Sequence, residues 1–207
     1  MEDVLDQYEL PYDPKHPLIC MDEMPCQLIG DVLVPVIPKP GKPKRIDYEY
    51  VRNGTCCVFI AFDPHTGWRI VSVREHRTKA DYADFMKKVA QHYPDAEYIR
   101  VVQDNLNTHS ASSFYEALPP ELAFELAKKF EFHFTPKKGS WLNMAEIEFS
   151  ALSRQCLNRR IGDIKTLAKE AGAWEQDRNR IKATVRWQFT KNKAREKFYR
   201  HYLRIQN

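Results

Sequence analysis

The apolar run at 98–103 places the strongest limit on how this chain can fold. Its residues are apolar enough for a strand at the centre of a sheet. A helical stretch at 78–93, with Thr78 as its N-cap candidate, precedes this run, and two more helical stretches, at 111–118 and 120–130, follow it. A central strand between helices is typical of an α/β fold.

The other periodic segments supply the remaining elements of this fold. Further strands are expected at 18–22, 48–62, 68–73 and 130–134, and the segment 27–37 has room for one more short strand. A turn signal at 63–67 joins two of them as an antiparallel hairpin. Further helices are expected at 141–157, 163–182 and 190–204, the first of them capped by Ser140. We therefore predict a mixed α/β sheet with helices on its faces.

The chain divides into three segments. Residues 1–17 contain Pro11, Pro14 and Pro17 and are expected to form a linker or an extended N-terminal arm. Residues 18–160 hold the sheet, and residues 161–207 form a basic helical extension that packs on the same domain or continues it. Residues 151–207 carry 15 Lys and Arg against 5 Asp and Glu, whereas residues 1–150 carry 17 against 23. This asymmetry predicts a polyanionic partner, although a solvated helix face would give the same pattern.

Composition excludes several classes of protein. No apolar run approaches the roughly 18 residues of a membrane span, and the acidic first residues are unlike a secretory or mitochondrial leader. The five cysteines include no C-x-x-C pair, so reduced thiols are expected instead of a disulfide framework or a zinc cluster. We expect an intracellular, cytoplasmic protein that makes no contact with a membrane.

Three carboxylates stand where predicted elements end or begin. Asp22 closes the run 18–22, Asp104 follows the strand 98–103, and Glu146 lies near the start of the helix 141–157. In open α/β sheets, sites gather at the carboxyl ends of strands. Hard carboxylate oxygens suit Mg²⁺, and a pair of such ions can drive phosphodiester chemistry. The alternative is that each acid only forms an ion pair or is exposed to solvent.

Local geometry separates these acids from their acidic neighbours. Glu148 lies about 200° around the helix from Glu146, so the two carboxylates cannot serve one site. Glu23 is adjacent to Asp22 and faces the opposite side of a strand, so it is excluded from the same site.

Several segments resemble conserved blocks of the insertion sequence 630 type of transposase, in the mariner superfamily. They are CMDE at 20–23, RIDYEYVRNGT at 45–55, VVQDNLNTH at 101–109, TPKKGSWLNMAE at 135–146, WQFT at 187–190 and AREK at 194–197. The blocks occur in the family's order and cover nearly the whole chain from about residue 18.

The resemblance implies an RNase H-like fold with a five-stranded mixed sheet and an Asp-Asp-Glu triad at Asp22, Asp104 and Glu146. Asp22 would contact two Mg²⁺ or Mn²⁺ ions, and Asp104 and Glu146 would hold one each. Family members hydrolyse the phosphodiester at the transposon end and transfer the freed 3′-hydroxyl into target DNA, typically at TA. The implied setting is a prokaryotic cytoplasm, in association with the nucleoid.

The same resemblance sets the expected partners. Family members usually carry helix-turn-helix domains before the triad, but only about 20 residues precede Asp22. We therefore expect double-stranded DNA, both transposon ends and target, as the substrate of a homodimer, with a separately encoded helix-turn-helix subunit as a further partner. The 41 residues between Asp104 and Glu146 exceed the spacing of the mariner relatives, and the helical stretch near 119–120 accounts for the difference.

Further residues are candidates to support the triad or to contact DNA. Asn143, His109 and Asn105 are the candidates to support the metal ligands, although the sequence favours a capping or core role for His109. Trp141 is expected either to stack on DNA or to anchor the core. The predicted DNA contacts are Lys137, Lys138, Trp141, Lys42, Lys44, Arg45, Arg178, Arg180, Arg186 and Lys191.

Two other functions fit the sequence less well. The chain could be a catalytically inactive, transposase-derived module for DNA binding or dimerisation, in which case Mn²⁺ binding would not depend on Asp22. It could also be a general RNase H-like nuclease, which would cleave RNA–DNA hybrids without strand transfer.

Overall fold

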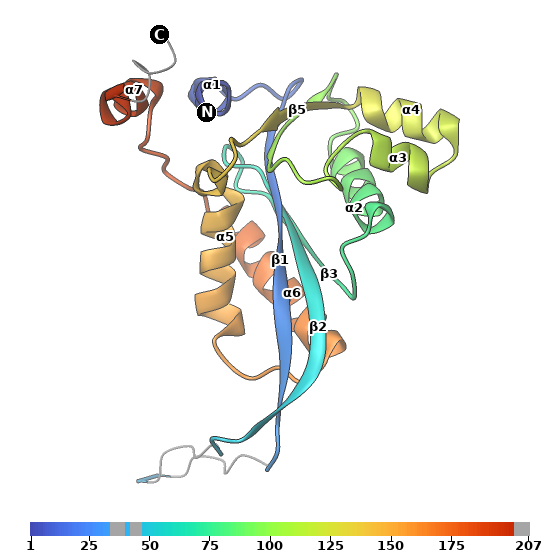
Figure 1. Ribbon diagram of the computed structural model, residues 1–207, viewed down its shortest axis with the longest axis vertical. Coiled ribbons are helices and arrows are strands. Elements are labelled where there is room, and N and C mark those ends of the chain that lie inside the picture. Colours follow the sequence, from blue (N-terminus) through green and yellow to red (C-terminus); the bar gives the residue numbers. More distant parts are fainter. Residues whose placement is uncertain (34–39, 42–46, 201–207) are drawn as a thin grey trace.

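The computed structural model describes residues 1–33, 40–41 and 47–200, and it contains one five-stranded sheet with helices on both faces (Figure 1). The strand order is β3-β2-β1-β4-β5. Strand β2 is antiparallel to β1 and β3, whereas β4 is parallel to β1 and β5. The strands are β1 (Leu18–Asp31), β2 (Tyr50–Phe62), β3 (Arg69–Arg74), β4 (Ile99–Gln103) and β5 (Phe130–Phe134). The predicted mixed α/β sheet is confirmed.

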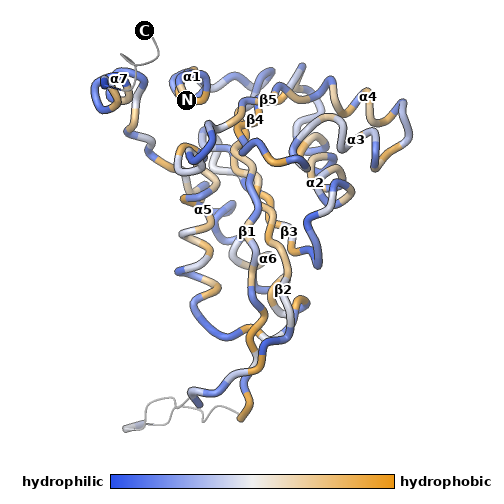
Figure 2. Tube along the Cα trace, viewed as in Figure 1, coloured by the Kyte–Doolittle hydropathy of each residue, from blue (hydrophilic) through white to orange (hydrophobic). Residues whose placement is uncertain are grey.

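Side chains alternate between two hydrophobic cores, one on each face of the sheet. Leu18 and Cys20 of β1 enter the first core, while Ile19 and Met21 enter the second. The first core is covered by α1 (Glu2–Glu9), α5 (Ala145–Leu152), α6 (Ile164–Arg180) and α7 (Lys191–Lys197). The second is covered by α2 (Lys79–His92), α3 (Ser112–Ala117) and α4 (Pro120–Lys128). Figure 2 shows apolar residues following the strands between these layers.

Strand β1 is longer than predicted and does not end at Asp22. It continues to Asp31, and its register with β2 extends from Cys20 opposite Phe62 to Asp31 opposite Tyr50. Strand β4 pairs with β1 only over Leu18–Cys20. Beyond that point β1 has a partner on one side only, which is where a strand tolerates a proline such as Pro25. Asp22 therefore lies just past the end of the β4 pairing, in mid-strand.

The N-terminal segment also differs from the expected extended arm. Residues Glu2–Glu9 form helix α1, and Val4 and Leu5 are fully buried in the first core. The hydroxyl of Tyr8 donates to the carbonyl of Leu142 at 2.7 Å. The prolines that suggested an extended chain begin only at Pro11, so they do not oppose the helix before them.

The segment that carries Glu146 is not one continuous helix. A short 3₁₀ turn (Ser140–Leu142) comes first, α5 follows, and a π-helical turn (Ser153–Leu157) ends the segment. Ser140 makes no side-chain cap; instead Oδ1 of Asn143 accepts from the backbone N–H of Ala145 at 3.1 Å. Elsewhere the predicted caps hold, since Thr78 forms a capping box with Asp81 at the start of α2. Within the described chain, no helix has the length and apolarity to cross a bilayer.

Candidate active site

Asp22 is a buried carboxylate on the face of β1 that looks toward α5. Only 6% of the residue is exposed. Its Oδ1 accepts from the backbone N–H of Glu23 at 2.9 Å, and its Oδ2 lies 3.5 Å from the side-chain amide nitrogen of Asn143. These contacts fix the carboxylate but bring no positive charge to it.

The charges of two predicted acids act on the third. Burial raises the pKa of Asp22 to about 7, against the opposing hydrogen bond from Glu23, and the charges of Asp104 and Glu146 raise it further. We refer to Asp22, Asp104 and Glu146 together as the acidic cluster. Asp104 is partly exposed and Glu146 is exposed, so the cluster is open to solvent.

The donor set suits a hard divalent cation. All three groups are carboxylates, and a nearby cation would relieve the repulsion that raises the pKa of Asp22. In the ranges that the structure describes, no three His, Cys, Asp or Glu side chains already close on a single metal position. That openness is compatible with Mg²⁺, which keeps several waters and needs only one or two protein carboxylates.

Asp104 begins the loop after β4, where the sheet no longer holds it. Nδ1 of His109 lies 2.6 Å from Oδ1 of Asp104 and 3.1 Å from its carbonyl oxygen. The other ring nitrogen, Nε2, lies 2.5 Å from Oε2 of Glu23. Burial alone would lower the pKa of His109, but its contacts with Asp104 and Glu23 outweigh burial and raise the pKa to about 10. His109 is therefore a charged, buried bridge between two carboxylates.

Glu23, which the sequence analysis excluded from the site of Asp22, contacts the histidine that lies beside Asp104. It does face away from Asp22, as strand alternation requires, but its side chain is only 1% exposed and contacts His109. The guanidinium of Arg77, which is 59% exposed, lies 3.9 Å from its other oxygen. An acid directly after Asp22 was visible in the sequence, but nothing there linked it to a histidine 86 residues away.

Asn143 ties the start of α5 to β1. Its side chain is fully buried, and its amide nitrogen donates to the carbonyl of Met21 at 2.8 Å. Together with the cap to Ala145, this bond positions the helix that carries Glu146 beside the strand that carries Asp22. Asn143 does so from two residues before the first residue of α5. The third supporting candidate, Asn105, is exposed in its loop.

Glu146 and Glu148 point in different directions, as helix geometry predicted. Glu148 is fully buried and lies 2.8 Å from Nε of Arg69 and 2.8 Å from Nη2 of Arg178. Glu146 is exposed. The guanidinium of Arg178 is thus paired within the fold, and its contact with DNA stays a prediction.

The remaining DNA candidates differ in availability. Lys191 pairs with Asp6 of α1, and Arg180, although 72% exposed, pairs with Asp177 at 2.6 Å. Trp141 is 46% exposed and meets Phe189 edge-on, with 5.3 Å between ring centroids. Lys137, Lys138 and Arg186 are exposed. Lys42, Lys44 and Arg45 lie outside the described residues.

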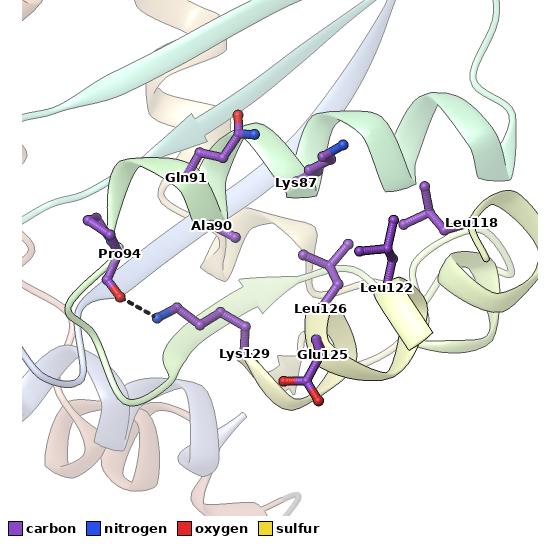
Figure 3. Close-up of a pocket in the computed structure, with 9 residues that line it drawn as sticks. All are labelled: Lys87, Ala90, Gln91, Pro94, Leu118, Leu122, Glu125, Leu126 and Lys129. Atoms are coloured by element: carbon purple, nitrogen blue, oxygen red, sulfur yellow. Dashed lines mark hydrogen bonds between the residues drawn. The ribbon is translucent and has the colours of Figure 1, made fainter. Parts of the chain in front are cut away.

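An apolar hollow lies away from the acids, between the C-terminal half of α2 and α4. Figure 3 shows Leu118, Leu122 and Leu126 facing Ala90, with Lys129 at one end donating to the carbonyl of Pro94 at 3.2 Å. No member of the acidic cluster lines it. The hollow is therefore separate from the acidic cluster.

Comparison with known proteins places the chain in a family and finds solved structures with the same fold. A family model described as "DDE superfamily endonuclease" matches residues 17–168. Two solved structures, the "Mos1 transposase paired-end complex with left transposon end" and the "Mos1 mariner paired end complex with Mn", each match with a TM-score of 0.56 at 15% identity. Each match covers 84% of this chain, and 51% and 52% of the respective solved chains. No curated protein matches the sequence. The chain thus spans about half the length of the structures it resembles and shares their fold.

Proposed function

Because this chain belongs to the DDE superfamily endonucleases, we propose that it is the catalytic domain of a DNA transposase of the insertion sequence 630 type. It would hydrolyse phosphodiester bonds at transposon ends and join the freed 3′-hydroxyl to target DNA. The observation that carries the proposal is the family match over residues 17–168, and the charges of Asp104 and Glu146, which raise the pKa of the buried Asp22, support it. Such a cluster costs stability unless a cation binds it.

The triad would hold two Mg²⁺ or Mn²⁺ ions, with Asp22 contacting both and Asp104 and Glu146 contacting one each. When bound, such ions supply an activated water and neutralise charge on the phosphate. The two ligands would have different roles. Asp22 is held in a fixed position on β1, whereas the exposed Glu146 can contact DNA and solvent. Asn143 would keep these two ligands in register through its bond to Met21.

DNA would reach the acids across the loop before α5. Lys137, Lys138 and the exposed face of Trp141 border the segment that leads to Glu146, and Arg186 adds an exposed charge further along the chain. Lysine and arginine supply non-specific phosphate contacts, and an exposed indole can stack on a base. Lys191 would become available to DNA only by exchanging Asp6 for a phosphate.

The wider assembly is part of the same proposal. Residues 18–160 would form the catalytic domain and residues 161–207 its basic extension, acting as a homodimer on double-stranded DNA with a TA target. A separately encoded helix-turn-helix subunit would read the transposon ends. Support comes from the two solved Mos1 structures of the same fold, which are paired-end complexes, one of them with Mn.

A nicking assay tests the proposal. The full chain, with Mg²⁺ or Mn²⁺, is incubated with labelled intact or pre-nicked transposon ends, alone and with the helix-turn-helix partner. We expect metal-dependent cleavage and strand transfer that Asp104→Asn abolishes. Equal product from wild type and Asp104→Asn would refute a catalytic role, and DNA binding without an Asp22-dependent Mn²⁺ site would favour an inactive binding module.

A further inference from the structure

Strand β4 does not hold the side chain of Asp104 in place, because Asp104 follows the last residue of the strand. The strand ends at Gln103, and Asp104 leads into the loop 104–111 with its side chain 27% exposed. A metal ligand in such a place needs another group to hold its carboxylate in one orientation. The structure offers His109, whose ring is 1% exposed and lies 2.6 Å from Oδ1 of Asp104.

His109 is itself held from the opposite side. Its second ring nitrogen faces Glu23 of β1 at 2.5 Å, so each nitrogen meets a carboxylate. On the Asp104 side, Nδ1 lies within ion-pair distance of Oδ1 and hydrogen-bonds the backbone carbonyl of the same residue. His109 thus connects Glu23, on β1, with Asp104, in the loop after β4.

Further contacts prevent this bridge from turning or sliding. The ring of Tyr82, from α2, stacks on His109 with 5.1 Å between centroids and 25° between planes. The side-chain amide of Gln103 donates to the backbone carbonyl of His109 at 3.1 Å and accepts from the hydroxyl of Tyr82 at 2.9 Å. Every member of this set is buried. These contacts hold the ring and the backbone of His109 in one orientation.

We propose that Glu23 and His109 are positioning residues, which fix the Asp104 carboxylate for metal binding through a buried carboxylate–histidine–carboxylate bridge. This inference rests on the proposed function. Adjacent residues of β1 then serve both ligands: Asp22 contributes its own carboxylate on one face, and Glu23 orients Asp104 from the other. The separation between the two aspartates is set by the sheet and not by the loop.

Mn²⁺ titration calorimetry on the full chain tests the bridge without relying on catalysis. The variants are His109→Ala and the gentler Glu23→Gln, which keeps the side chain's size and one acceptor. The matched control is His133→Ala, because His133 is also a buried histidine between two carboxylates, 3.0 Å from Asp3 and 3.1 Å from Glu131, but lies outside the acidic cluster.

We expect His109→Ala to weaken Mn²⁺ binding by about 10–100-fold, as loss of groups behind metal ligands does elsewhere. Glu23→Gln should weaken it less, and His133→Ala should leave the Mn²⁺ affinity unchanged even if it lowers the melting temperature. In the nicking assay, His109→Ala should need more Mn²⁺ for half-maximal rate and regain activity at high Mn²⁺, whereas Asp104→Asn should not.

The outcomes separate the two proposals. Asp22-dependent Mn²⁺ binding that is equally strong in His109→Ala and His133→Ala overturns the bridge and leaves the proposed function standing. A wild-type chain without an Asp22-dependent Mn²⁺ site overturns both. If His109→Ala does not fold, Glu23→Gln decides: wild-type Mn²⁺ affinity in that variant refutes the bridge.

Discussion

The buried ion cluster behind α5 makes a quantitative prediction about the stability of the fold. Glu148 and Arg69 are both fully buried, and Arg178 completes the cluster from α6 with its side chain 15% exposed. Glu148→Gln keeps the volume of the side chain but removes the charge that both guanidinium groups face. Arg69 would then remain inside the protein without its ion-pair partner.

The expected loss follows from the burial of that cation. Removing one partner of a buried ion pair costs about 3–5 kcal/mol. The arginine's other contacts replace the carboxylate only in part: it donates to the carbonyl of Ala183 and lies over the ring of Phe62 at 5.1 Å, and the charge of Glu175 acts on it more weakly than that of Glu148. Removing Arg178 instead should cost less, about 1–3 kcal/mol, because Glu148 keeps Arg69.

Urea denaturation followed by circular dichroism measures these differences. The control is Asp177→Asn, which breaks the exposed pair with Arg180 and should cost less than about 1 kcal/mol. For a chain of this size, a loss of about 3–5 kcal/mol corresponds to a fall of roughly 6–20 °C in melting temperature. A loss for Glu148→Gln no larger than that for Asp177→Asn would refute the reasoning.

Three further predictions concern the acidic cluster and its surroundings. The metal-free chain should lose stability as pH rises from about 4 to 7, because the folded pKa of Asp22 is raised to about 7 and the unfolded state therefore binds fewer protons in that range; Asp22→Asn should flatten this slope in pH-dependent urea melts. Asn143→Ala should cost about 1–3 kcal/mol in the same melts, since it strips the carbonyl of Met21 of its donor inside the core, and a loss below that of an exposed Asn→Ala change would contradict the role assigned to it. Replacing both Lys137 and Lys138 by alanine should lower the slope of log DNA affinity against log salt by about 2, measured by fluorescence anisotropy, and an unchanged slope would remove both from the DNA path.

Much of the fold followed from local patterns whose physics is contained in a few residues. Helix α2 was predictable because its apolar spacing and the Thr78 cap act within single turns. Strand β4 was predictable because both of its faces are buried, which leaves an unbroken apolar run. The separation of Glu146 from Glu148 required only the rotation per residue of a helix.

Other features depended on contacts between distant segments. Acidic side chains of helix α1 form ion pairs with distant segments, as Asp6 does with Lys191 of α7. Such tertiary contacts cannot be predicted from the local sequence of the helix. Strand β1 runs through Pro25 because its pairing with β4 ends at Cys20, opposite Val102, which the sequence of β1 alone does not show. The Glu23–His109 contact spans 86 residues and two elements, so strand alternation correctly gave the direction of Glu23 but not what lay there.

The alternation of β1 has a consequence for insertions and deletions. Asp22 and Glu23 look to opposite faces, and the hydrophobic residues before them do the same. A one-residue insertion between Pro17 and Asp22 would send Glu23 toward the α5 face in place of Asp22 or, if the apolar residues held their places, would bulge the strand. In the first case Asp104 would lose its anchor at the same time as its partner ligand. A one-residue length change that no bulge absorbs should therefore eliminate the acidic cluster in a single step.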